Sequence, residues 1–334
     1  MSLSNFDYIL IGAGVAGCTL AAEITKRELG SVLLLEAGGP PTSIHLKVPS
    51  HYPRAFASRF AWGDSTVAQS GLANRRIMVP AGRTLGGSSA INAMIWMQGH
   101  SSDFASWHSS AGEDWHPQHV SDAYRTLEQA IGICDLAMPT LHPIVANFLQ
   151  HTCPAEPRLD RLTHPQLGVG PFVRCQRNGR RQSAWDLQLK SERASPSLTI
   201  RTDSTVDHVL FDLDRAIGVQ VTTPNATESI RANKGVIVCA GALHSPRLLI
   251  ASGLADKEDL RAIGVGLIRD LPAVGKNLHN HLVYPIVHRL RSGESLSPTP
   301  NAADRAAYVR DRTGPRSSNI AEAFAWFQVE RRRR

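Results

Sequence analysis

The sequence predicts an α/β fold that opens with a strand–helix–strand unit. Residues 6–14 (FDYILIGAG) begin with an apolar run typical of a buried strand, residues 15–29 have helical character, and residues 31–39 (SVLLLEAGG) contain a second apolar strand. Residues 235–241 (GVIVCAG) repeat the strand pattern and lead into a helix-like segment. The chain has 334 residues, 42% of them hydrophobic, which is enough for about two domains with a sizeable core.

The stretch after the first unit is less regular. Residues 37–75 contain four prolines and are expected to form a long loop, which in a compact protein is usually functional. A Gly/Ser-rich turn follows at residues 82–90, and residues 91–97 (INAMIWM) could open a helix. Residues 122–133 fit a short amphipathic helix, whereas residues 134–171 are rich in proline and predict no firm element.

Regular structure is predicted again in the second half. Residues 199–223 alternate β-branched and polar side chains around a turn at residues 213–215, as a β-hairpin does. The strand at 235–241 then runs into a helix that has Pro246 near its first turn and Gly253 at its end.

Composition excludes several classes of protein. There are 36 Lys and Arg against 29 Asp and Glu, but residues 331–334 alone supply four of the seven net positive charges, so we expect no nucleic-acid partner. No uncharged apolar run reaches the length of about 18 residues that a membrane span needs. Asp7 near the N-terminus is unlike a signal peptide, and the five cysteines lack zinc-site spacing. These features predict a cytoplasmic chain with reduced thiols and no structural metal.

Three glycines and one acid form a dinucleotide-binding fingerprint. Gly12, Gly14 and Gly17 (GAGVAG) follow the first strand and open the helix, where they allow a tight turn, close approach of a pyrophosphate and helix–strand packing, respectively. Glu36 ends the second strand, where an acid binds the adenosine ribose hydroxyls and repels a 2′-phosphate. The pattern predicts binding of an ADP moiety.

Further segments resemble the glucose–methanol–choline (GMC) oxidoreductases, and in particular choline dehydrogenase-like members. Residues 82–99 (GRTLGGSSAINAMIWMQG), followed by residues 103–107 (DFASW), look like the first signature of that family. Residues 241–254 (GALHSPRLLIASGL) are similar to the second signature, and residues 271–282 (LPAVGKNLHNHL) resemble the segment that follows it. The resemblance covers roughly residues 6–327 and only the N-terminal portion of the family pattern.

The resemblance implies a Rossmann-like FAD-binding domain with a partial, mainly antiparallel substrate domain. The FAD-binding domain would comprise residues 1–140 and 199–285, and the substrate domain residues 141–198 and 286–334. FAD is the implied cofactor. The residues expected to bind it, beyond the fingerprint and Glu36, are Arg83, Gly87, Ser88, Asn92, Ala93, Ile95 and Val206.

The residues themselves agree with these roles. Backbone amides of the turn that contains Gly87 and Ser88 can donate to anionic oxygens, and Arg83 adds positive charge beside them. Asn92 can both donate and accept at a polar flavin edge, with a helix cap as the alternative, and ordinary turn chemistry is the alternative for Ser88. Val206 would present its backbone to the adenine.

The implied activity is FAD-dependent oxidation of alcohols, in which hydride passes from the alcohol carbon to flavin N5 and a base removes the hydroxyl proton. In the family the catalytic histidine lies in a C-terminal segment beyond the part matched here, so the chain is expected to be truncated before it, and the catalytic residue is unknown. His244, in a variable slot of the second signature, and His281, in a structural turn, are not assigned as the base. Trp62 resembles an aromatic residue before a substrate-side loop, with a core tryptophan as an equal alternative.

Other functions stay open. A non-catalytic flavin-binding fragment, or half of an assembly, and a lyase like the hydroxynitrile lyases of this family are the alternatives, whereas an NAD-dependent dehydrogenase leaves the two later signatures without a role. No histidine occupies the signature loop itself, which favours non-covalent flavin. The alcohol, the electron acceptor (oxygen, or a quinone or dye) and the oligomeric state are not predicted.

Overall fold

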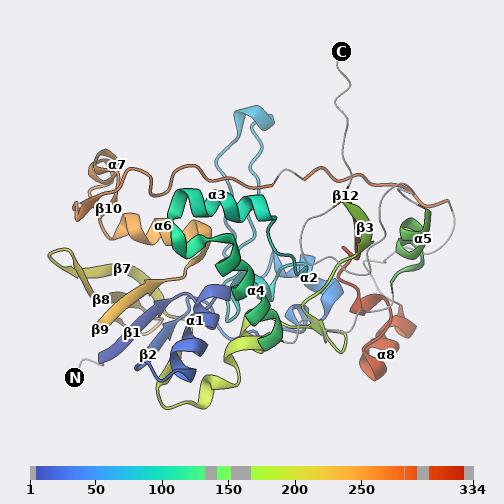
Figure 1. The fold of residues 1–334 in the computed structure, drawn as a ribbon, viewed down its shortest axis with the longest axis horizontal. Helices are drawn as coiled ribbons and strands as arrows, with labels where there is room; N and C mark the ends of the chain where they lie inside the picture. Colours follow the sequence, from blue (N-terminus) through green and yellow to red (C-terminus); the bar gives the residue numbers. More distant parts are fainter. Residues whose placement is uncertain (1–4, 132–140, 152–166, 282, 292–300, 327–334) are drawn as a thin grey trace. The chain divides into compact units, whose positions relative to one another are not determined.

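The computed structural model of the protein describes residues 5–131, 141–151, 167–281, 283–291 and 301–326 (Figure 1). The chain divides into two compact units. The first comprises Met1–Thr42, Ala55–Ile91 and Ser183–Ser295, and the second comprises Ser43–Arg54, Asn92–Gln182 and Leu296–Arg334. The domain boundaries expected from the sequence stay a prediction.

A six-stranded mixed sheet forms the centre of the first unit, in the order β6-β2-β1-β9-β8-β7. Strands β6, β2, β1 and β9 run parallel to one another, and β8 and β7 continue the sheet antiparallel. The strands are β1 (Asn5–Ile11), β2 (Val32–Leu35), β6 (Leu198–Arg201), β7 (Thr205–Asp212), β8 (Arg215–Thr222) and β9 (Thr227–Val238).

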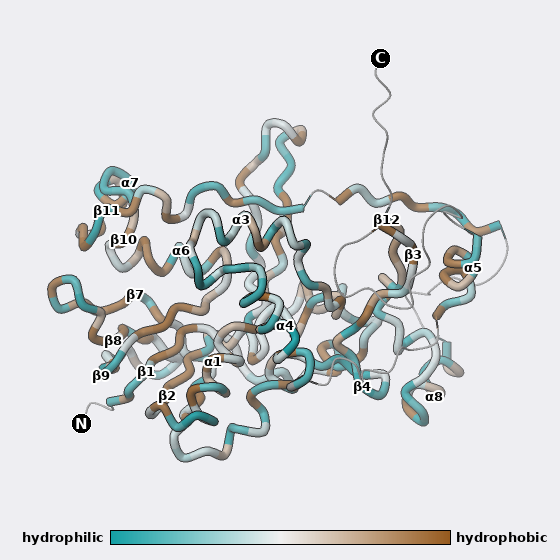
Figure 2. Tube along the Cα trace, in the orientation of Figure 1, coloured by the Kyte–Doolittle hydropathy of each residue, from teal (hydrophilic) through white to brown (hydrophobic). Residues whose placement is uncertain are grey.

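Both faces of this sheet are buried. On one face Leu10 and Leu34 pack with the small side chains of α1 (Val15–Lys26), and on the other face Ile9 and Leu33 pack with Val219 and with side chains of β7 and α6 (Gly241–Ala251). Parallel strands covered on both faces are expected to read as continuous apolar runs, which is why β2 and the buried second half of β1 are hydrophobic (Figure 2).

Short elements complete the first unit. Strand β10 (Leu254–Ala255) pairs parallel with β11 (Arg269–Asp270), and helix α7 (Lys257–Ala262) lies between them in sequence. Residues 61–82 form a two-stranded arm through antiparallel bridges that join Ala61 to Gly82 and Ser65 to Met78. The short helical turns are η3 (Ser70–Leu72), η4 (Gly87–Ala90), η7 (Trp185–Leu189) and η8 (Glu192–Ala194).

The second unit contains helices and two small antiparallel sheets. Strand β12 (Ala323–Trp326) pairs with β3 (Gly168–Pro171), and β4 (Gln176–Arg177) pairs with β5 (Arg180–Arg181). Its helices and helical turns are η1 (Ile44–Leu46), η2 (Pro49–His51), α3 (Ser101–Ala111), η5 (Glu113–Trp115), α4 (Pro117–Ile131), α5 (Pro143–His151), α8 (Ala302–Asp311) and η9 (Pro315–Ser317). Helix α2 (Tyr52–Ala55) lies at a boundary between the units in sequence.

The predicted α/β fold and its opening strand–helix–strand unit are confirmed, with β1 and β2 parallel on either side of α1 in sequence. The hairpin is confirmed only for β7 and β8. Residues 198–201 form a separate strand, β6, which pairs with β2, because a turn with Asp203 at φ 51° separates it from β7.

Two other predictions were wrong. Residues 91–97 do not open a helix, because Met94 adopts a left-handed conformation (φ 62°) and the Asn92 side chain accepts the Met94 N–H at 3.0 Å in place of a helical carbonyl. The region 134–171 holds a helix, α5, whose Pro143 occupies the first helical position, where its missing N–H costs nothing. The amphipathic helix expected at 122–133 begins earlier, at Pro117, as α4.

Candidate functional site

The glycine turn between β1 and α1 leaves no room for side chains at two of its three glycines. A Cβ on Gly17 would lie 1.9 Å from the Gly12 carbonyl oxygen, and a Cβ on Gly12, whose φ is +98°, would lie 2.6 Å from the Cys239 carbonyl oxygen. A Cβ on Gly14 would meet nothing within 4 Å. Gly12 and Gly17 therefore serve packing of the fold, whereas Gly14 leaves open space where a ligand can approach the backbone.

Glu36 at the end of β2 is held by the backbone on both sides. Its Oε2 accepts the Ala13 N–H at 2.9 Å, and its Oε1 accepts the Gly38 N–H at 2.9 Å. The side chain is only 5% exposed. Burial raises the pKa of this carboxyl to about 7, although the two backbone donors and the nearby Arg83 charge act to lower it. Each oxygen keeps a lone pair for a further donor, such as a hydroxyl of a ligand.

A cavity of about 810 Å³ lies in the first unit over the carboxyl ends of β1, β2 and β9. Its volume is within the range of about 300–1,000 Å³ that is typical of small-molecule sites. The carboxyl ends of parallel strands are where open α/β sheets bind ligands. Six of the predicted cofactor-binding residues line it, namely Gly12, Gly14, Glu36, Gly87, Ser88 and Val206.

The turn at η4 approaches the glycine turn closely. A Cβ on Gly87, whose φ is +52°, would lie 2.7 Å from the Gly14 Cα. Ser88 Oγ accepts the Gly82 N–H at 3.1 Å, which is the ordinary turn chemistry expected as the alternative role of this serine. Ser88 also lines the cavity, so both roles are compatible. The two segments, far apart in sequence, thus form one wall.

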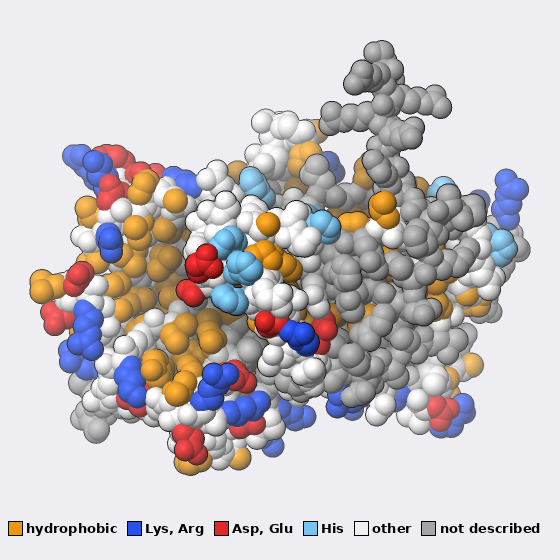
Figure 3. Space-filling model, viewed as in Figure 1, with side chains coloured by type: hydrophobic (Ala, Val, Ile, Leu, Met, Phe, Trp, Pro, Cys, Tyr) orange, Lys and Arg blue, Asp and Glu red, His pale blue; other side chains and the backbone are white. Residues whose placement is uncertain are grey.

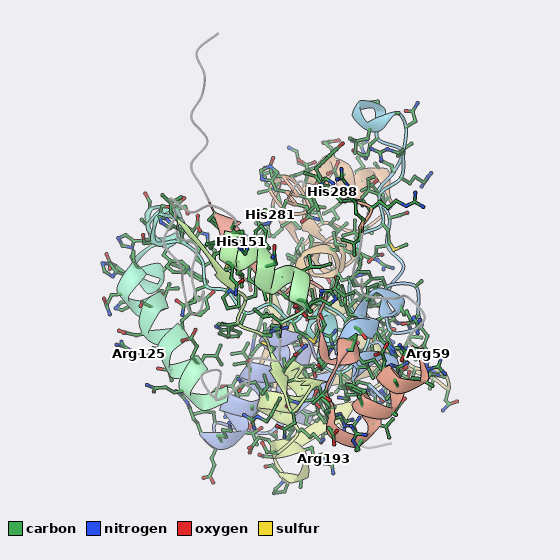
Figure 4. The ribbon with its side chains drawn as sticks, turned by 90° about the vertical axis from the view of Figure 1, so that its right-hand side faces the viewer. Arg59, Arg125, His151, Arg193, His281 and His288 are labelled. Carbon is green, nitrogen blue, oxygen red and sulfur yellow. The ribbon has the colours of Figure 1, made fainter. Side chains whose placement is uncertain are left out.

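Gly17 and Arg83 do not line this cavity. Gly17 lies within α1, and the Arg83 guanidinium lies over the Trp62 ring, 4.9 Å from its centroid. Arg83 lines a second cavity of about 290 Å³ together with Arg59, whose side chain is exposed (Figure 4), and Asp203.

Asn92, Ala93 and Ile95 belong to the second unit. Arg181 donates to both the side-chain oxygen and the backbone oxygen of Asn92, at 2.7 and 2.6 Å. The Asn319 side chain donates to the Ala93 carbonyl at 2.7 Å, and Ile95 forms an antiparallel bridge with Arg174. No helix begins at Asn92, so this residue is not the helix cap that was its alternative. Flavin contact by these three residues stays a prediction.

The sequence did not reveal that His244, on the cavity wall, pairs with Asp64. His244 Nε2 lies 2.9 Å from Asp64 Oδ2, although 180 residues separate them. The Trp62 ring stacks on the His244 ring with centroids 4.1 Å apart, and both rings line the cavity. The position of His244 in a variable slot gave no signal for this pair. His281 is exposed and does not line the cavity (Figure 4).

Among the described residues, the cysteines are free thiols. Burial raises the pKa of the Cys18 thiol to about 12, which makes it a poor nucleophile, and Cys175 and Cys239 are also free. The remaining two cysteines, Cys134 and Cys153, lie outside the described residues.

Histidine side chains gather on one face in Figure 3. In the second unit the His108 and His116 rings meet edge to face with centroids 5.1 Å apart, and the His116 and His119 rings are tilted with centroids 5.6 Å apart. Within the described residues, no group of three or more His, Cys, Asp or Glu side chains could hold a metal ion. Nor does that part of the chain contain a helix long and apolar enough to cross a membrane.

Comparison with known proteins defines the class to which this fold and site belong. Residues 6–283 match the family model of the GMC oxidoreductases. The chain is 34% identical to the oxygen-dependent choline dehydrogenase of Photobacterium profundum over 96% of its own length and 63% of that protein. The chain belongs to the GMC oxidoreductase family, so the resemblance inferred from its motifs is confirmed.

Solved structures agree. Pyridoxine 4-oxidase from Mesorbium loti is 31% identical, with a TM-score of 0.73 over 80% of this chain and 55% of that protein. Formate oxidase from Aspergillus oryzae, an FAD protein, has a TM-score of 0.81 at 23% identity over 96% of this chain and 61% of that protein, which shows the shared fold. The family carries FAD, as expected from the motifs. The chain spans about 63–65% of the length of the curated relatives that it matches.

Proposed function

We propose that the cavity of the first unit binds the ADP part of FAD. The observation that supports this most strongly is the combination of an open Gly14 and a buried Glu36 on the wall of one cavity. The helix α1 N-terminus with its free N–H groups suits the pyrophosphate, and Glu36 suits the ribose hydroxyls. Val206, which also lines the cavity, would contact the adenine.

The remaining cofactor roles are carried over from the family pattern. Gly87 and Ser88 would donate to the pyrophosphate from the opposite wall, and Arg83 would add positive charge nearby. Asn92, Ala93 and Ile95 would contact the flavin. Retention of the cofactor would be non-covalent, since the signature loop contains no histidine.

We further propose that the protein oxidises the CH–OH group of a small-molecule alcohol. FAD, when bound, would supply the acceptor for the hydride that leaves the alcohol carbon. The residues described above would bind and orient the cofactor. Choline is one candidate substrate, because choline dehydrogenases are the relatives matched at 34% identity, and pyridoxine is another, because a pyridoxine oxidase is the neighbour matched at 31% identity.

The test is an absorption spectrum of the purified chain followed by anaerobic addition of choline, benzyl alcohol and pyridoxine. A flavin spectrum that bleaches on addition of one alcohol supports both proposals, and its recovery in air, or only with a quinone or dye, identifies the electron acceptor. A flavin that stays oxidised with every alcohol would contradict the proposed activity of this chain and favour the non-catalytic or lyase alternative. Absence of any flavin after incubation with FAD would contradict the binding proposal.

A further inference from the structure

His244 occupies a position on the cavity wall that the family pattern does not assign. It lies in the first turn of α6, and its imidazole lines the same cavity as Gly14 and Glu36. The side chain is 11% exposed, so the ring is held inside the wall rather than lying on the surface. It is therefore an ionisable group in place to touch whatever fills the cavity.

Asp64 fixes the orientation of that imidazole. Its carboxylate lies 2.9 Å from His244 Nε2, which places a proton on Nε2. The other ring nitrogen, Nδ1, has no hydrogen-bond partner among the described residues. A carboxylate on one nitrogen of a histidine sets the tautomer and strengthens the other nitrogen as a hydrogen-bond acceptor.

Trp62 fixes the plane of the same ring. The Trp62 and His244 rings are 4.1 Å apart at an interplanar angle of 29°, and the Arg83 guanidinium lies 4.9 Å from the Trp62 centroid. Asp64 and Trp62 both come from the base of the arm formed by residues 61–82, which also supplies Val79 to Gly82 to the cavity wall. The two contacts restrain both rotation and tilt of the imidazole.

We propose that His244 is a further cofactor-contacting residue, which presents Nδ1 to the dinucleotide in the cavity, and that Asp64 and Trp62 are its positioning residues. This inference rests on the proposed binding of FAD. Because Nε2 donates to Asp64, Nδ1 would accept a hydrogen bond from a hydroxyl of the dinucleotide.

Variants of His244 distinguish the contribution of Nδ1 from that of Nε2 to FAD binding. The Gln amide reaches the position of Nε2 and the Asn amide that of Nδ1, whereas Phe keeps the stack on Trp62 and removes both nitrogens. Dissociation constants for FAD, measured by flavin fluorescence, should rise about tenfold for His244→Phe and His244→Gln, as expected for one lost hydrogen bond in a cavity. His244→Asn should stay within about threefold of the unchanged chain because it keeps the contact at Nδ1.

A double-mutant cycle tests the role of Asp64. Asp64→Asn should weaken FAD binding in the unchanged chain but add nothing in the His244→Phe background, because it acts through the ring nitrogen that Phe lacks. Asp64→Glu should restore part of the affinity. An equal effect of Asp64→Asn in both backgrounds would overturn the positioning role.

His281→Phe is the matched control, because His281 is exposed and does not line the cavity. Thermal unfolding of each variant without FAD checks that the fold is retained. Unchanged FAD affinity in His244→Phe would overturn the inference while leaving the proposed function intact. A chain that binds no FAD before any substitution would overturn the proposed function, and this inference with it.

Discussion

Glu36 is a buried carboxyl, and its contribution to the stability of the fold depends on pH because burial shifts its pKa. Its pKa is raised to about 7 by burial, from an ordinary value of 4.5, so the folded chain binds a proton more tightly than the unfolded chain. The unfolding free energy should therefore fall as pH rises from about 4.5 to above about 7, by about 3 kcal/mol from this group.

Glu36→Gln should remove this dependence. A glutamine accepts through one oxygen only, so either the Ala13 or the Gly38 N–H loses its acceptor, at a cost of about 1–3 kcal/mol. Urea unfolding should show that the stability difference between the unchanged chain and Glu36→Gln is about 2.5 kcal/mol smaller at about pH 8 than at about pH 5. The exposed Glu113, changed to Gln, is the control. A difference that is the same at both pH values would contradict the argument.

At the level of residues, the sequence identified the groups that belong to a contiguous motif. Gly12, Gly14 and Glu36 could be predicted because strand, turn and helix are consecutive, and their spacing alone brings them to one edge of the sheet. The pair of His244 with Asp64 could not be predicted, because it depends on where the arm lies against α6, a contact across 180 residues that no local pattern encodes.

The turn from β1 to α1 is an element in which two glycines have separable roles. Gly17→Ala should destabilise the fold, because its Cβ would overlap the Gly12 carbonyl oxygen and push α1 away from the sheet. Gly14→Ala should leave the fold intact, since the site is open and its φ of −77° suits alanine, but should weaken FAD binding by obstructing the approach of the pyrophosphate.

Thermal unfolding and FAD titration of the two variants measure these effects together. We expect Gly17→Ala to lose about 1–3 kcal/mol or more of stability. Gly14→Ala should lose about tenfold or more in affinity, with a smaller loss of stability of about 0.5–1 kcal/mol, because Gly14 is the N-cap of α1 and alanine is a poorer N-cap residue. Unchanged FAD affinity in Gly14→Ala would show that the open space at Gly14 does not serve a ligand.

At the level of elements, the long apolar strands and α1 could be predicted from the periodicity of apolar residues. Places where a side chain takes a backbone N–H away from a helix could not. The segment 91–97 has a helix-like composition, yet one Asn92 side chain takes the Met94 N–H and ends any helix there. Strand β6 is only four residues long, and its pairing with β2, which places Val32 opposite Leu198, joins segments far apart in the sequence that no local pattern connects.

At the scale of the molecule, the cavity links segments from Ile11 to Ala251 within the first unit. A ligand that contacts all of these segments binds only when they are folded together, so it stabilises the folded state by mass action. Free FAD at about 100 times its dissociation constant should add about 2.7 kcal/mol to the unfolding free energy of the state that binds it.

Hydrogen exchange should therefore slow in the cavity-lining segments when FAD is added. Protection should rise at residues 12–17, 204–207 and 238–248, because opening of these segments would break contacts with the ligand. ADP should reproduce the protection at residues 12–17 and 204–207, since the ADP part is assigned to the glycine turn and to Val206. Exchange in α8 of the second unit, Ala302–Asp311, serves as the internal reference. Protection by ADP in α8 but not at the glycine turn would place the nucleotide elsewhere and contradict the assignment of this cavity.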